Sequence, residues 1–90
     1  NMMSAEEVYE KLAEHYVQGT IDSPGEDLAV MEGSVNGTIY KTTVRCGMPG
    51  NPSASQALYE VNVDMVTGIA SQTRMLLPDG NVVQFSLRDN

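Results

Sequence analysis

Cysteine and histidine are nearly absent from this chain, because Cys46 and His15 are the single residues of their types. A lone cysteine excludes a disulfide within the chain and a cysteine-based zinc site. A metal site would therefore have to be built almost wholly from carboxylates. The motifs G-x-S-x-G, H-E-x-x-H and C-x-x-C do not occur, and the glycines at 47–50 lack the lysine of a phosphate-binding loop. We predict no cofactor and no catalytic or metal-ligating residue.

Basic residues are also scarce, with five Lys and Arg against twelve Asp and Glu, which gives a net charge of −7. The five are scattered at Lys11, Lys41, Arg45, Arg74 and Arg88. Neutralising phosphates requires clustered Lys and Arg, so this charge opposes binding to nucleic acid and to anionic membranes. We interpret the acidity first as a solubilising surface and second as a site for a basic partner.

Long apolar runs and a targeting leader are missing as well. No stretch approaches the roughly 18 consecutive apolar residues of a membrane span. The chain starts Asn1-Met2-Met3-Ser4, without a basic and apolar leader, so Met2 is the expected natural start and Asn1 a cloning remnant. We predict a cytoplasmic protein. The alternative is a secreted or periplasmic protein whose leader was removed.

Residues 1–90 are predicted to form one small domain that begins with an amphipathic helix. Ser4 and Glu7 form a capping box, in which each side chain accepts the backbone amide of the other residue. Apolar residues then recur at spacings of three and four, namely Ala5, Val8, Tyr9, Leu12 and Tyr16. Gly19 is expected to end the helix. Its apolar side needs a sheet to cover it.

The dipeptide Asn36-Gly37 predicts a β-hairpin, because both central residues of the matching turn adopt positive φ. The predicted pairs are Val35–Thr38, Gly33–Tyr40, Met31–Thr42, Ala29–Val44 and, on the other face, Glu32–Lys41. A tyrosine opposite a glycine is favourable in a sheet. The following stretch at 47–56 has two prolines and is predicted to be a loop.

A three-stranded meander is predicted after that loop. A three-residue turn at Val66-Thr67-Gly68 would pair Met65–Ile69, Val63–Ser71, Val61–Thr73 and Tyr59–Met75. A similar turn at Pro78-Asp79-Gly80 would pair Met75–Val83, Thr73–Phe85 and Ser71–Leu87. We therefore predict an α+β fold, with one N-terminal helix packed on an antiparallel five-strand sheet made of a hairpin and a meander. Its predicted core joins Ala5, Val8, Leu12 and Tyr16 to Val61, Val63, Met75 and Phe85.

Glu60, Asn62 and Asp64 alternate along one predicted strand and raise the question of a functional site. In the predicted register they face Arg74, Gln72 and Ala70 on the side of the sheet away from the helix. They follow a ladder and do not converge on one point, as a catalytic or metal site requires. Two alternative calcium sites, Asp22, Glu26 and Asp27 with Glu32, or Asp64 with Thr67 and Gly68, do not follow the spacing of calcium-binding loops. We interpret all of them as surface and turn residues.

His15 and Cys46 are the remaining candidates for chemistry. A general base at His15 would need a nucleophile and an orienting group, which no motif supplies. The alternative is a histidine at the surface or at the edge of the core. Cys46 has the inward parity of Tyr40 and Val44, so we interpret it as a small buried apolar residue.

Apolar residues are also expected on the outer face of the sheet. Leu58, Leu76 and Val82 would form a row across the meander, and Val30 and Ile39 occupy a similar position on the first hairpin. A contiguous exposed apolar patch indicates a covered surface, so these five residues are the predicted partner interface. The alternative is a row that reflects only the preference of Leu and Val for strands.

The sequence from Tyr59 to Gly68, YEVNVDMVTG, resembles the hairpin of PepSY-type modules. That resemblance implies a small helix-plus-antiparallel-sheet domain of the kind associated with peptidase propeptides and envelope proteins, which restrains proteases or binds partners. It transfers no functional residue to this chain.

The expected function is that of a small acidic, non-enzymatic protein-interaction module, which binds a protein partner or forms a homodimer through the outer sheet face. The alternative is an acidic inhibitor that mimics nucleic acid and binds a basic partner. Hydrolase chemistry through His15 ranks third. Neither nucleic acid nor a membrane is expected as a partner.

Overall fold

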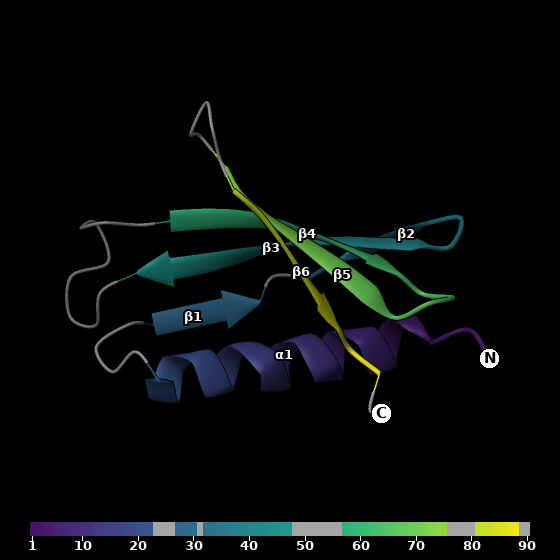
Figure 1. The fold of residues 1–90 in the computed structure, drawn as a ribbon, viewed down its shortest axis with the longest axis horizontal. Coiled ribbons are helices and arrows are strands. Elements are labelled where there is room, and N and C mark those ends of the chain that lie inside the picture. Colours follow the sequence, from purple (N-terminus) through teal and green to yellow (C-terminus); the bar gives the residue numbers. More distant parts are fainter. Residues whose placement is uncertain (23–26, 31, 48–56, 76–80, 89–90) are drawn as a thin grey trace.

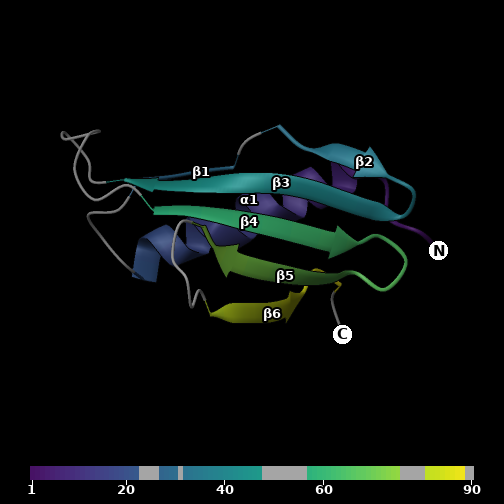
Figure 2. The ribbon, with the colours of Figure 1, turned by 90° about the horizontal axis from the view of Figure 1, so that it is seen from above.

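The structure, a computed structural model, describes residues 1–22, 27–30, 32–47, 57–75 and 81–88, without the side chains of 17–22, 27–29, 46, 47 and 57. One helix packs on one antiparallel sheet, which confirms the predicted α+β fold (Figure 1). The strands are β1 (Asp27–Val30), β2 (Ser34–Asn36), β3 (Ile39–Gly47), β4 (Ala57–Asp64), β5 (Ile69–Arg74) and β6 (Val82–Ser86). The order across the sheet is β1-β3-β4-β5-β6, and β2 continues the β1 edge along β3. All the strands lie on one side of α1 (Figure 2).

The helix α1 (Ala5–Asp22) begins at the predicted cap. The amide of Glu7 donates to Ser4 Oγ at 3.1 Å, and the amide of Val8 donates to the Ser4 carbonyl at 3.0 Å. The helix does not end at Gly19 as predicted. One glycine costs a helix interior only about 1 kcal/mol, and α1 packs along β1 at this end. Within the described ranges, no helix is both long and apolar enough to cross a membrane.

The turn between β2 and β3 lies later in the chain than predicted. Asn36 faces Ile39, so the loop is Gly37-Thr38 and not Asn36-Gly37. Gly37 has a φ of 64°, the positive value that the hairpin signal predicts. The pairing shifts by two residues, and an even shift keeps every side chain on its predicted face. Tyr40 accordingly points toward the helix and is 4% exposed.

The β1 and β2 edge contains a β-bulge. Ser34 faces Lys41, whereas Val30 faces Val44, so three residues on this edge oppose two on β3. The extra residue moves each side chain of β1 to the face opposite the predicted one. Val30 therefore packs against the core, although the predicted register paired Val44 with the residue before it.

The turn between β4 and β5 is one residue longer than predicted. The loop is Met65–Gly68, and Val63 faces Ala70, whereas the prediction placed Met65 opposite Ile69. A slip of one residue moves every side chain of β5 to the opposite face. Ala70 is therefore fully buried, and Ile69 is 40% exposed.

Local hydrogen bonds explain the longer loop. Asp64 Oδ1 accepts the amides of Val66 at 2.9 Å and Thr67 at 3.3 Å, as Asp often does at a turn. Met65 is buried in the core, and its carbonyl accepts the amide of Met3 at 2.8 Å. The loop therefore includes Met65, which does not pair with β5 and instead contacts the N-terminal segment.

The pairing of β5 with β6 also differs from the prediction. Phe85 faces Ala70 and not Thr73, and Val83 faces Gln72. The predicted turn at 78–80 between these strands lies outside the described residues. Gln72 consequently points toward the helix, where a polar partner has to be found for it.

The core between α1 and the sheet comprises Met3, Val8, Leu12, Tyr16, Tyr40, Val44, Val61, Val63, Met65, Ala70 and Leu87. Five residues predicted for it are confirmed, namely Val8, Leu12, Tyr16, Val61 and Val63. Phe85 is half-buried and packs against them. Two predictions are wrong, because Ala5 is exposed and Met75 lies outside this core after the slip in β5.

Both described ends of the chain meet the β4–β5 loop. The amide of Leu87 donates to the Gly68 carbonyl at 2.8 Å. Arg88 Nη2 donates to the Val66 carbonyl at 2.9 Å and also to the Asn1 carbonyl. Gly68 has a φ of 79°, and a Cβ at this position would lie 2.6 Å from Arg88 Cγ. Glycine is thus required here both by the turn and by the arginine that crosses it.

Candidate interaction site

The sheet face that α1 leaves uncovered is mainly polar. On β3, β4, β5 and β6, the register places these described side chains on that face: Lys41, Thr43, Arg45, Glu60, Asn62, Ser71, Thr73 and Gln84. Ile69 and Ile39 lie at one end of this face, beside the β4–β5 loop and the β2–β3 turn. A continuous apolar surface over the middle of this face is therefore not formed by the described residues.

The predicted row of Leu58, Leu76 and Val82 is separated by the observed register. Val82 faces Thr73, and Thr73 faces Glu60, so the row through Val82 meets β4 two residues away from Leu58. Leu58 is half-buried and Val82 is 62% exposed. Leu76 lies outside the described residues. The predicted geometry of this row is wrong for Leu58 and Val82, while a role for either in partner binding stays a prediction.

The two predicted interface residues of the first hairpin lie on opposite faces. Val30 packs against the core, so its predicted place on the outer face is wrong, and the cause is the β-bulge. Ile39 faces Asp64 on the outer face and is 37% exposed. Its role in an interface stays a prediction.

The polar ladder of β4 lies on the outer face as predicted. Asn62 Nδ2 donates to Glu60 Oε1 at 3.2 Å, and Lys41 Nζ lies 4.0 Å from the same oxygen. Lys41 thus approaches Glu60 and not Glu32 as predicted. Asp64 uses its carboxylate to hold the following turn. Exposed ion pairs of this kind contribute little to stability, about 0 to 1 kcal/mol.

Among the side chains that the structure describes, no three of the types His, Cys, Asp and Glu come together closely enough to hold a metal ion. Of the alternative calcium ligands, Glu26 lies outside the described residues. Asp64 is engaged by backbone amides of its own turn. The side chain of Cys46 also lies outside the described part, although its backbone belongs to β3.

His15 belongs to an aromatic cluster. Its ring stacks on Phe85 with centroids 4.0 Å apart and planes 2° apart, and it meets the ring of Tyr16 edge-on at 5.0 Å. The stack removes part of the imidazole from water, and this desolvation lowers the pKa of His15 below its usual 6.5. The imidazole is thus placed at the edge of the core, as one of the two interpretations of the sequence expected.

Tyr16 carries the polar end of this cluster into the sheet. Its hydroxyl donates to Gln72 Oε1 at 2.7 Å, which provides the partner that the inward-pointing Gln72 needs. Burial, with a smaller contribution from Tyr59, raises the pKa of Tyr16 to about 12. The hydroxyl therefore keeps its proton under ordinary conditions and serves as a structural hydrogen-bond donor.

The free edge of the sheet was not among the sites predicted from the sequence. β6 is the last strand in the order, and no described strand pairs with its outer side (Figure 2). Its five residues, Val82 to Ser86, carry no charge and no proline. Val82 and the neighbouring Val83 are 62% and 49% exposed. The signal was present, because the last strand of a predicted meander is necessarily an edge unless the chain returns beside it.

A scan against protein-family models, a search of curated proteins and a search of solved structures each found no match to this chain.

Proposed function

We propose that this chain is a non-enzymatic protein-interaction module, which extends its sheet by pairing β6 with a strand of a partner. The observation that carries the proposal is the uncharged edge at β6, where two adjacent valines are about half exposed or more. An edge strand presents unpaired backbone N–H and C=O groups, and strand addition satisfies them.

The two edges of the sheet differ in how they are protected. Proteins protect edge strands with charges, proline, bulges or a covering element. The β1 and β2 edge has the bulge and is packed by α1 along β1. None of the protective residue types occurs in β6. This contrast supports β6 as the binding edge.

A second copy of the chain is one partner that fits this edge. Two β6 strands related by a two-fold axis would pair antiparallel, each presenting the same residues to the other. The net charge of −7 opposes such a dimer in general, but β6 itself is uncharged. The proposed interface thus moves from the outer face, where the sequence placed it, to the edge.

The test uses two matched substitutions, Val82→Lys on β6 and Val35→Lys on β2. Both valines lie on edge strands and are exposed, by 62% and 47%. We expect Val82→Lys to abolish partner capture from the native host or self-association in light scattering, because a lysine blocks edge pairing. Val35→Lys should leave association unchanged, and circular dichroism should show both variants folded. Equal behaviour of the two variants, or a wild type that neither self-associates nor captures a protein, contradicts the proposal.

A second candidate function is that of an acidic protein that occupies the nucleic-acid site of a basic partner. It is favoured by the exposed carboxylates of α1, which come from Glu6, Glu7, Glu10 and Glu14. A complex held by these charges would weaken steeply with added salt, whereas a β6 complex held by backbone hydrogen bonds and valines would resist it.

Two further hypotheses about function are less well supported than these two. The PepSY-like resemblance of the Tyr59–Gly68 hairpin is compatible with partner binding but adds no site. Hydrolase chemistry through His15 is the least favoured, because one face of the imidazole is stacked on Phe85 and the ring of Tyr16 lies edge-on to it. An altered phenotype in a His15→Ala strain whose protein remains folded would revive it.

A further inference from the structure

A pocket of about 400 Å³ lies between the first turns of α1 and the bulged edge of the sheet. Its volume falls within the range of small-ligand sites, roughly 300 to 1,000 Å³. The lining residues are Ala5, Glu6, Tyr9, Glu32, Gly33 and Tyr40. They come from three segments: the helix, the bulge and β3. This pocket takes no part in the strand pairing proposed for β6.

One wall of the pocket is fixed by Tyr40. The far end of its ring lies directly over Gly33, where a Cβ would come within 2.6 Å of Tyr40 Cε1. The backbone of Gly33 also hydrogen-bonds to the phenolic oxygen. Tyr40 is only 4% exposed, so its ring has one position set by packing. This wall exists before any ligand arrives, which lowers the entropy cost of binding.

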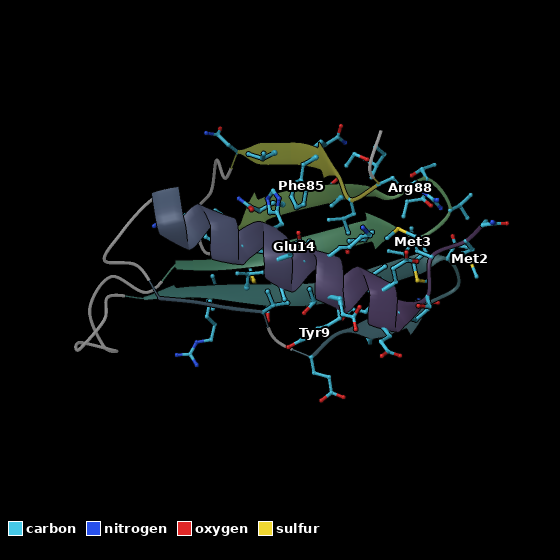
Figure 3. All side chains as sticks on the ribbon, turned by 90° about the horizontal axis from the view of Figure 1, so that it is seen from below. Met2, Met3, Tyr9, Glu14, Phe85 and Arg88 are labelled. Carbon is cyan, nitrogen blue, oxygen red and sulfur yellow. The ribbon has the colours of Figure 1, made fainter. Side chains whose placement is uncertain are left out.

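The second aromatic wall comes from Tyr9, which is 42% exposed on α1. In Figure 3, Tyr9 lies on the side of the helix opposite Phe85, at the edge formed by β1 and β2. Tyr9 is also close enough to Tyr40 to raise its pKa. Two tyrosine side chains from different elements therefore line one pocket.

The pocket carries negative charge at its rim. Glu6 on the helix and Glu32 on the bulge contribute two exposed carboxylates, and no Lys or Arg is among the described lining residues. The pKa of Tyr40 is raised, mainly by burial and further by Tyr9 and Glu32, while the hydrogen bond from Gly33 opposes the shift. The start of α1 contributes a partial positive charge of about one half, which is less than the charge of the two carboxylates.

From this geometry we propose that the pocket binds an organic cation through its guanidinium or ammonium group. The exposed ring of Tyr9 attracts such cations through its quadrupole, the fixed Tyr40 side chain shapes the adjoining wall, and the carboxylates at the rim add charge-assisted hydrogen bonds. An anion would be repelled by Glu6 and Glu32. A purely apolar ligand would leave both carboxylates without a partner and would gain nothing from them.

The proposal is independent of β6, which lies at the opposite edge of the sheet. The same cation could reach the pocket as a side chain of a basic protein or as a free small molecule. Both sources present the same cationic group to the pocket, but only a protein also presents a peptide backbone beside it. The probes are therefore a Gly-Gly-Arg-Gly-Gly peptide with blocked ends, the same peptide with neutral citrulline, and free ethylguanidinium.

Binding would be followed by NMR at low salt in the wild type and three variants. Glu32→Gln and Tyr9→Leu each remove one exposed wall group, and Glu14→Gln removes an exposed helical carboxylate outside the pocket. We expect the arginine peptide to shift the resonances of Tyr9, Gly33 and Tyr40 in a saturable manner. Each pocket variant should weaken binding about two- to fivefold, as expected for an exposed cation–π or carboxylate contact, and Glu14→Gln should leave it unchanged.

The outcomes separate clearly. Saturable binding of the arginine peptide that the citrulline peptide lacks supports the cation site. Ethylguanidinium binding as tightly as the peptide indicates a small-molecule ligand, and weaker binding indicates a protein ligand. Equal binding of the citrulline peptide, shifts spread over all acidic residues, or equal weakening by Glu14→Gln and Glu32→Gln would overturn the proposal. Loss of edge pairing in Val82→Lys would leave this result unaffected.

Discussion

The contact between Gly33 and Tyr40 makes a sharp prediction about stability. In Gly33→Ala the new Cβ would overlap the end of the tyrosine ring, at 2.5 Å from Oη and 2.6 Å from Cε1. Tyr40 is buried in the core and cannot turn away without opening a void. Overpacking of this kind costs about 1 to 3 kcal/mol, a large part of the 5 to 15 kcal/mol that typically stabilises a domain. Urea unfolding followed by circular dichroism would measure the loss.

A second background isolates the cause. Tyr40→Leu keeps an apolar side chain but removes the ring atoms that lie over Gly33. Gly33 does not have a positive φ, so alanine fits its backbone and should stabilise this background by about 0.4 to 1 kcal/mol. The effect of Gly33→Ala should thus change sign between the two backgrounds, with a coupling energy of about 2 kcal/mol. The same loss in both backgrounds would refute the reasoning.

Three further predictions concern α1. Ser4→Ala should cost about 1 kcal/mol of stability, and Ser4→Asp should not, because only the second retains an acceptor for the amide of Glu7; thermal unfolding checks this. The pKa of Tyr16 is about 12 when folded and near 10 when unfolded, so stability should decrease as pH rises from 10 to 12, and this decrease should be smaller in Tyr16→Phe, which retains the contribution of Tyr40, whose pKa is also raised. The folded pKa of His15 is lowered, so the unfolded chain binds its proton more tightly and stability should fall as pH decreases through 6.5, until it levels off below the folded pKa. Subtracting the pH profile of His15→Gln from that of the wild type isolates this effect, and a difference curve that is flat around pH 6.5 would contradict it.

The fold class could be predicted because local signals for it are strong and agree. The N-cap at Ser4, the spacing of Val8 and Leu12 and the presence of a hairpin near Gly37 are each readable within a few residues. The strand register was predicted less accurately than the fold class. It depends on the length of the turns, and Asp64 binds two amides of its own turn and lengthens the loop by one residue. Each extra turn residue moves all the side chains of the following strand to the opposite face. An error of one residue in the turn therefore placed the side chains of β5 on the wrong faces.

The candidate sites depend on these long-range details. The row through Leu58 and Val82 was predicted from registers that a single turn residue changes. The bulge that turns Val30 inward left no clear sign in the sequence, because an extra residue in an edge strand requires no special residue type. The pocket was equally hidden, since Tyr9 and Glu32 are brought together only when the helix docks beside the bulged edge.

Arg88 donates to the carbonyls of Val66 and Asn1 and so joins both described ends of the chain to the β4–β5 loop. This contact, the Arg88 corner, also bears on the order of folding. Its bond to Asn1 joins residues 87 positions apart, so nearly the whole chain must be closed into a loop before it can form. The entropy cost of closure grows with the logarithm of loop length, and distant contacts therefore tend to form after local hairpins. We expect the β4–β5 hairpin, whose strands are joined by the short loop Met65–Gly68, to protect its amides early in refolding and the Arg88 corner to do so late. In the native state the same corner should open most readily, so hydrogen exchange at Leu87 and Met3 should occur without global unfolding.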